Sequence, residues 1–162
     1  MTPTQTQSVP PHLMMKQMVC APWLTQSIYV AAELGIADLV ASEPRSAEEL
    51  AAAAGVDGQS LRRVLRALAS VSIFRETPNG FEQTPLSECL ISAPGSLRAW
   101  ARMGGVGWQW QTIGDLLETV KTGRDSIRRT YGKGRFDLKM NLPPMDWKKV
   151  RKGIEAGHAG LP

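Results

Sequence analysis

The middle of the chain contains a succession of helix-start and helix-stop signals that leaves few choices of fold. Ser46 is followed three residues later by Glu49, the spacing of a capping box, and Gly55 ends the helix that this box begins. Asp57 is placed to cap a second helix. The pair Asn79-Gly80 then predicts the turn of a β-hairpin. Helix, turn, helix and hairpin in this order predict a mainly α protein, a winged helix-turn-helix with a small β-hairpin wing.

A long helical pattern precedes this region, over about residues 12–34, and Pro22 predicts a kink or two helices meeting near Ala21. The part from residue 24 to residue 34 is apolar on nearly every side, apart from a narrow polar stripe formed by Gln26 and Glu33. A helix that is apolar on most sides is buried on most sides, in a deep core or against a partner subunit. The residues predicted to form a dimer interface are Met14, Met18, Trp23, Leu24, Ile28 and Ala31.

Three more helices are expected after the hairpin. The first follows Thr84-Pro85, because proline is favoured at a first helical position, and the second follows Ser96. The third covers about residues 108–121 and ends at Thr122-Gly123. The glycine-rich run at 104–107 separates the second helix from the third.

Charge is distributed unevenly along the chain, which has a formal net charge of +4. Residues 1–120 carry eight Lys or Arg against eleven Asp or Glu, and the excess of positive charge lies after them, in a tail that includes Lys148, Lys149, Arg151 and Lys152. On the second helix, Arg62, Arg63 and Arg66 could form a face that binds DNA. The alternative is that they form a solvated face, or that Arg66 is paired to a carboxylate within the fold. Because the predicted wing has no Lys or Arg to neutralise phosphates, the solvated face is favoured and nucleic acid is not expected as a partner.

The sequence pattern indicates neither a membrane span nor a site built from cysteines. It has no apolar run of 18 residues, so no membrane span is expected. Cys20 and Cys89 form neither a zinc pattern nor a disulfide framework, and are expected to be buried small hydrophobic residues. No metal site is predicted, and a cytoplasmic, reducing compartment fits best.

Several segments resemble one family, in the right order: the run from "IYVAAELGIADLV" to "LRRVLRALASVSIF", then "FEQTPLSECLISAPGSLRAWARM", "GDLLETVKTG" and "YGKGRF". They look like the N-terminal dimerisation domain of the S-adenosylmethionine-dependent O-methyltransferases of the hydroxyindole, caffeic acid and polyketide-tailoring type. The resemblance implies a winged helix with additional helices that form an intertwined homodimer. It predicts a domain over residues 11–136, after a disordered stretch at 1–10 and before a basic tail at 137–162 that does not continue the family's pattern.

The same resemblance implies a set of site residues. In the full-length family S-adenosylmethionine is the cofactor, but no cofactor-binding or catalytic residue can be assigned in this chain, and no cofactor is expected for it alone. A methionine matching Met103 contacts the aromatic acceptor in relatives, so Met103, Trp108 and Trp110 are candidate substrate-lining residues, against the alternative that they are core or interface residues. Ser72 stands where the family usually has glycine.

These expectations predict a dimerisation domain of an O-methyltransferase-family protein, truncated before the S-adenosylmethionine-binding domain and inactive alone. The partner would be a second copy or a full-length methyltransferase. Two alternatives remain open at this stage: a fragment or frameshifted form of an active small-molecule O-methyltransferase, and a winged-helix DNA-binding regulator.

Overall fold

A computed structural model describes residues 9–132 of the chain, and these residues are mainly helical with one small two-stranded sheet. They fall into two compact units, divided between Gly105 and Val106. The mainly α class predicted from the sequence is confirmed.

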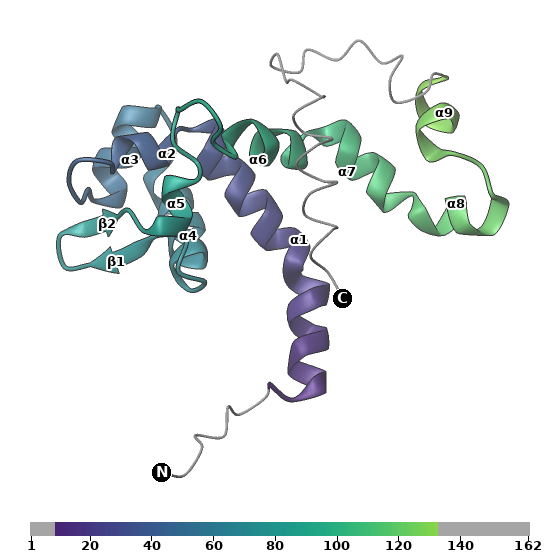
Figure 1. Cartoon of the computed structure of the whole chain (residues 1–162), viewed down its shortest axis with the longest axis horizontal. Coiled ribbons are helices and arrows are strands. Elements are labelled where there is room, and N and C mark those ends of the chain that lie inside the picture. The colour runs from purple at the N-terminus through teal and green to yellow at the C-terminus, as the bar shows by residue number, and fades with distance from the viewer. Residues whose placement is uncertain (1–8, 133–162) are drawn as a thin grey trace. The chain divides into compact units, whose positions relative to one another are not determined.

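The first unit begins with its longest helix, α1 (Pro11–Glu33), which continues through Pro22. The proline was expected to kink the helix or divide it in two; the helix is not divided, and its axis changes direction along its length (Figure 1). After α1, Gly35 adopts a left-handed conformation with φ 66°, and the short helix α2 (Ile36–Leu39) follows it. Glycine adopts positive φ without steric cost, so it permits this sharp reversal of the chain.

The next two helices begin as their capping residues predict. At the start of α3 (Ala47–Ala54) the Ser46 N–H donates to Glu49 Oε2 at 2.8 Å, and the Glu49 N–H donates to Ser46 Oγ at 3.2 Å. At the start of α4 (Gly58–Ala69) the Ser60 N–H donates to Asp57 Oδ1 at 2.8 Å. Each cap satisfies backbone donors that the first turn of a helix leaves without partners.

The hairpin packs beside α4 (Figure 1). Strand β1 (Arg75–Thr77) pairs antiparallel with β2 (Gly80–Glu82), and Arg45 adds an isolated bridge to Phe81 on the other edge of β2. The helix α5 (Pro85–Glu88) follows, capped by the Thr84 hydroxyl as its Thr-Pro start predicts.

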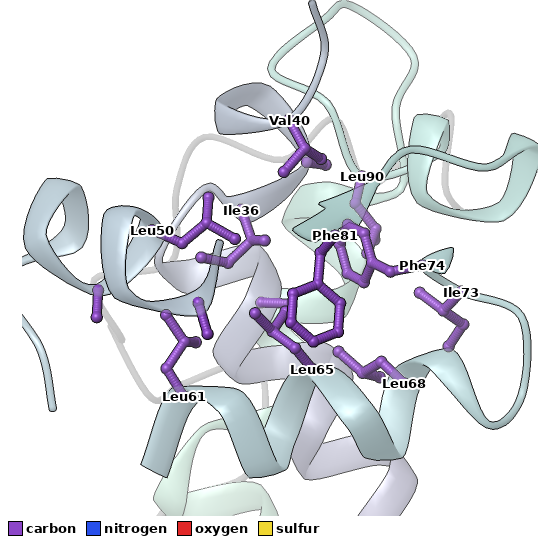
Figure 2. Close-up of a cluster of buried hydrophobic side chains, with 14 residues drawn as sticks. Ile36, Val40, Leu50, Leu61, Leu65, Leu68, Ile73, Phe74, Phe81 and Leu90 are labelled. Atoms are coloured by element: carbon purple, nitrogen blue, oxygen red, sulfur yellow. The ribbon is translucent and has the colours of Figure 1, made fainter. Parts of the chain in front are cut away.

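The core of the first unit lies between these elements. Figure 2 shows its side chains pointing toward one another from α2, α3, α4 and the hairpin. The largest fully buried members are Phe74, Ile36, Leu50, Leu65 and Leu68. Burial of side chains of this size contributes roughly 1.5–3 kcal/mol each, so this cluster is the main source of stability for the unit.

The last helix of the first unit is α6 (Arg98–Gly105), as expected after Ser96. The prediction of a single helix over residues 108–121 is wrong. The second unit has two helices in this region, α7 (Gly107–Gly114) and α8 (Leu116–Thr122), which meet at Asp115. Gly114 and Asp115 are poor helix formers, which explains the break. A further helix, α9 (Ser126–Tyr131), was not predicted, although Asp125 caps it by accepting from the Ile127 N–H at 2.9 Å.

Ser72 generates a first testable prediction. Among residues 9–132 it is the one non-glycine residue with positive φ, at 62°. A left-handed conformation costs a residue with a Cβ roughly 1–2 kcal/mol, and glycine does not have this cost. Glycine loses more backbone entropy on folding, however, so only part of this free energy is recovered by the substitution. We expect Ser72→Gly to stabilise the protein by about 0.5–1 kcal/mol, measured by thermal and urea denaturation. The hydrogen bond that the Thr84 hydroxyl donates to the Ser72 carbonyl, at 3.0 Å, would be retained. A lower unfolding free energy for Ser72→Gly would contradict the strain argument.

Candidate functional site

The first half of α1 is an apolar surface that the described part of the chain does not cover. Every residue from 11 to 23 is exposed, and this segment is called the arm below. Its large apolar side chains are far more open than those of a core helix: Met15 is 61% exposed, Met18 62%, Val19 70% and Trp23 79%. Monomeric proteins rarely expose contiguous apolar patches of more than a few hundred Å², so the arm has the character of an interaction surface.

The second half of α1 is covered by the rest of the first unit. Leu24 and Ile28 are partly buried and pack against the core, and Ala31 is 1% exposed. The six residues expected at a dimer interface therefore occupy two environments. Met14, Met18 and Trp23 are exposed on the arm, whereas Leu24, Ile28 and Ala31 contribute to the subunit's own interior.

The polar stripe on the second half of α1 faces α6, which packs along it (Figure 1). The Arg102 guanidinium donates to both carboxylate oxygens of Glu33, at 2.6 and 3.0 Å. The Gln26 amide donates to the carbonyl of Gly105 at 3.3 Å. Bidentate arginine–carboxylate pairs fix orientation as well as energy. The two polar residues that interrupted the apolar pattern in the sequence thus position α6 on α1.

Close approach of the two helices depends on Gly105. A Cβ built at this position would lie 1.9 Å from Cγ of Tyr29 and 2.2 Å from its Cβ. No side chain fits in that space, so the C-terminal end of α6 rests directly on the Tyr29 side chain. This contact could not be found from the sequence, because a glycine at the end of a helix is usually there for its backbone conformation.

A second polar cluster anchors the start of α6. Arg98 donates from Nε to the Ala32 carbonyl at 2.9 Å and from Nη1 to Asp38 Oδ2 at 2.8 Å. The Ser92 N–H also donates to Asp38, at 2.7 Å. Burial opposes ionisation of Asp38, but the hydrogen bonds from Ser92 and the charge of Arg98 outweigh it, so the pKa of Asp38 lies below its ordinary value.

The candidate substrate-lining residues are assigned to different units. Met103, on α6, is buried at 3% exposure within the first unit. Trp108 and Trp110 lie on α7 in the second unit, and both are partly buried. The fixed position of α6 on α1 therefore holds Met103 in place, and a substrate role for these three residues stays a prediction.

The arginine face of α4 is solvated. Arg62, Arg63 and Arg66 are all exposed, and Arg66 Nε lies 3.4 Å from Glu76 Oε2 on the hairpin. Arg75, at the base of the hairpin, is likewise paired, with Glu82. Pairing of these cations with carboxylates removes charge that a nucleic-acid surface would need.

The expectation that both cysteines are buried is wrong for this chain. Cys20 and Cys89 are free thiols and both are exposed. Cys20 belongs to the arm, which nothing in the described chain covers. Cys89 follows α5 at its end, where its Sγ lies 3.5 Å from the Pro85 carbonyl oxygen. Sequence pattern indicates that a residue is apolar, but not whether its own subunit covers it.

Among residues 9–132, no helix is long and apolar enough to cross a bilayer. No group of three or more His, Cys, Asp or Glu side chains is placed to hold a metal ion in the same part of the chain. The basic cluster at 148–152 lies outside the described residues.

Comparison with known proteins identifies what these elements belong to. Residues 17–93 match the family model of the O-methyltransferase dimerisation domain. Phenazine O-methyltransferase PhzM of Lysobacter antibioticus is 41% identical over 153 residues, which are 93% of this chain and 44% of that protein. The mitomycin biosynthesis 6-O-methyltransferase of Streptomyces lavendulae is 39% identical over 119 residues, 72% of this chain and 34% of that protein.

Solved structures agree with the sequence matches. The crystal structure of LaPhzM superposes with a TM-score of 0.74 at 40% identity, over 93% of this chain and 42% of that one. The fold and these matches define a methyltransferase dimerisation module. The chain belongs to the O-methyltransferase family through this domain, as the sequence resemblance implied. It spans less than half the length of these relatives.

The close contact at Gly105 generates a second prediction. Gly105→Ala should destabilise the first unit by about 1–3 kcal/mol, because the new methyl group overlaps Tyr29 and the helices must separate. Gly107→Ala is the matched control: nothing lies within 4 Å of its added Cβ, so it should be neutral or slightly stabilising. Urea denaturation measures both. Equal stabilities for the two variants would show that α6 does not pack on Tyr29.

The Glu33–Arg102 pair generates a third prediction, on pH. Hydrogen bonding from Arg102 holds the pKa of Glu33 below its ordinary value of 4.5, against an opposing effect of burial. A lowered pKa means that the carboxylate stabilises the fold above pH 4.5 and loses this effect as the pH falls through the lower, folded-state value. Both side chains are more than a third exposed, so the contribution is about 0.5–1 kcal/mol.

We therefore expect Glu33→Gln to be less stable than the natural protein near neutral pH, and the difference to vanish in acid below the folded-state pKa. Urea unfolding across this pH range measures it. A difference that stayed constant with pH would show that the charge of Glu33 is not involved.

Proposed function

We propose that this chain pairs subunits through α1, forming a homodimer in which the arm of each copy is covered. The observation that carries the proposal is the arm itself: thirteen consecutive exposed residues of one helix, with Met15, Met18, Val19 and Trp23 among the most exposed apolar side chains of the first unit. A self-complementary interface buries each such surface twice, once on each copy. The match of residues 17–93 to a dimerisation domain supports the same conclusion.

The order α3, α4, hairpin is that of a winged helix, and we propose that it serves here as a scaffold for α1. No observation among residues 9–132 favours nucleic acid, since the exposed arginines of α4 and the hairpin are partly paired with carboxylates. A full-length methyltransferase is the alternative partner. In that heterodimer the partner would bind S-adenosylmethionine, whereas this chain would supply the pairing surface. A cytoplasmic, reducing compartment agrees with two exposed free thiols.

Relatives suggest what an assembly containing this chain would act on. They include a phenazine O-methyltransferase and a mitomycin biosynthesis 6-O-methyltransferase. We propose a planar, small-molecule methyl acceptor, with Met103, Trp108 and Trp110 as candidate contacts. Thioether and aromatic side chains suit planar rings through dispersion and sulfur–ring contacts.

Dimerisation is tested with one substitution on the arm. Val19→Lys should convert the dimer into a folded monomer, because it places a charge in the interface while the position is 70% exposed in the single chain. Lysine is a better helix former than valine, so loss of α1 would not explain the result. Light scattering on the full chain at micromolar concentration, with circular dichroism, measures both properties.

Val71→Lys is the matched control, since Val71 is 43% exposed and lies outside α1. It should remain a dimer. Ile28→Asp is a poorer test because Ile28 packs against the subunit's own core, so it would unfold monomer and dimer alike. A natural protein that is a compact 17.7 kDa monomer at these concentrations would refute the proposal.

A further inference from the structure

A groove of about 780 Å³ lies in the first unit beside the hairpin, and no residue of α1 lines it. It is bordered by the C-terminal turns of α4, by the start of β1 and by the start of α5. Its charged groups are Arg66, Arg75 and Glu76, and its apolar lining includes Phe74 and Leu86. The Leu86 side chain is 53% exposed, so part of this apolar lining is open to solvent.

The backbone of Glu76, the middle residue of β1, points away from β2. In the described part of the chain the sheet consists of β1 and β2, and Glu76 lies opposite Phe81. On its other side the Phe81 N–H donates to the Arg45 carbonyl at 2.7 Å, and the Phe81 carbonyl accepts from the Arg45 N–H at 3.0 Å. Opposed residues of an antiparallel pair exchange both of their backbone hydrogen bonds or neither. Glu76 and Phe81 therefore form a non-hydrogen-bonded pair, and the N–H and C=O of Glu76 face outward.

An outward-facing edge of this kind is a template for a further strand. No backbone group of residues 9–132 pairs with the N–H or the C=O of Glu76. An extended peptide on such an edge gains main-chain hydrogen bonds, and every second side chain enters an adjoining pocket. Here the adjoining pocket is the groove, which Glu76 itself lines. The outward backbone of Glu76 and the groove together are called the edge site below.

Charge at the edge site favours an acidic ligand. Arg66 and Arg75 line the groove, and each is paired with one carboxylate, of Glu76 and of Glu82. Arg62 lies one helical turn before Arg66 on the same face of α4, is exposed, and takes part in no ion pair within residues 9–132. Three cations therefore stand against two carboxylates, and a complementary partner carries negative charge.

A second copy of this chain fits the edge site poorly. Glu76 is the one residue of the three-residue strand β1 whose backbone groups face outward. Two copies that paired symmetrically through this edge would set their Glu76 side chains directly opposite each other. Like charges at directly opposed positions destabilise a pair of strands. The partner is therefore a different, acidic segment.

We propose that the edge site binds an extended, acidic peptide segment of another protein, which adds to the hairpin as a strand beside β1. The peptide residue opposite Glu76 exchanges two backbone hydrogen bonds with it. Apolar side chains on alternate residues of the peptide contact Leu86 and the floor of the groove at Phe74, and its carboxylates lie among the arginines. This binding surface is separate from the arm, so it is available whether or not α1 is paired.

The first test uses the full chain and a fluorescein-labelled heptapeptide, Glu-Leu-Glu-Leu-Glu-Leu-Glu, in which apolar and acidic side chains alternate. Fluorescence anisotropy should show saturable binding of one peptide per chain. The analogue with lysine in place of every glutamate should bind about ten-fold more weakly or worse, because its charge has the sign of the arginines.

The backbone contact is tested by substitution of Glu76. Glu76→Pro removes the outward N–H, and proline is tolerated on an edge strand at a position whose N–H faces outward. Glu76→Ala is the matched control, since it removes the same carboxylate and keeps the N–H. Because the peptide carbonyl loses its donor, Glu76→Pro should bind the heptapeptide about ten-fold more weakly than Glu76→Ala.

The groove is tested by substitution of Leu86. Leu86→Asp replaces an apolar contact with a charge that repels the peptide, and should weaken binding about ten-fold. Leu97→Asp is the matched control, because Leu97 is 56% exposed and does not line the groove. It should leave the affinity for the heptapeptide unchanged.

The peptide itself supplies a test that needs no variant protein. Methylation of its three leucine nitrogens removes donors that face β1, whereas methylation of three glutamate nitrogens removes donors on the opposite edge of the added strand. The peptide with methylated leucines should bind about ten-fold more weakly than the peptide with methylated glutamates.

The outcomes decide the proposal in each case. It is overturned if the natural chain does not bind the heptapeptide, if the lysine analogue binds as tightly, or if the two methylated peptides bind equally. If Glu76→Pro is unfolded by circular dichroism, the methylated pair decides. If Glu76→Pro lowers the oligomeric state of the chain and leaves its affinity for the peptide unchanged, the edge serves a second copy and the proposal is overturned. Val19→Lys, which alters the arm alone, should bind the peptide as the natural chain does.

Discussion

The division of α1 into a covered and an uncovered half is the constraint on which the rest of this structure depends. Residues 24–33 are fixed on one side by the core and on another by α6, whereas residues 11–23 have no contact within residues 9–132 that removes them from solvent. A helix of this length does not persist in water on its own propensity alone, because most helical stability in proteins comes from packing. The covered half therefore holds the arm in helical form, and the arm presents its apolar side chains in a fixed order.

The contact between α1 and α6 joins the helix that carries the arm to the last helix of the first unit. Two arginines of α6 bind carboxylates and a carbonyl of the first unit, and Gly105 brings the end of α6 against Tyr29. Met103 is buried, and in the sequence it lies between Arg102 and Gly105, the two residues of α6 that contact α1. Because packed interiors are poorly compressible, a displacement of the second half of α1 would also displace α6.

Much of the first unit could be predicted from the sequence because its boundaries are local. The caps at Ser46, Asp57 and Thr84 each depend on residues no more than three positions apart, and the structure contains all three. The contacts of α6 could not be predicted, because Arg102 and Glu33 are separated by 69 positions and Gly105 owes its importance to a side chain 76 positions earlier. The exposure of Cys20 was misjudged for a related reason: an apolar pattern predicts burial but does not say which molecule provides it. The break at Asp115 was missed because the apolar spacing continues across it.

The region around Pro22 has a consequence for how the arm meets other molecules. Proline has no N–H, so one backbone hydrogen bond of α1 is missing there. Just after it, the hydroxyls of Thr25 and Ser27 donate to the carbonyls of Ala21 and Trp23, at 3.2 and 2.9 Å, and such bonds bend a helix. These weakened turns place the most easily bent part of α1 between its anchored half and the arm, so the direction of the arm can change while the hydrophobic core stays as it is.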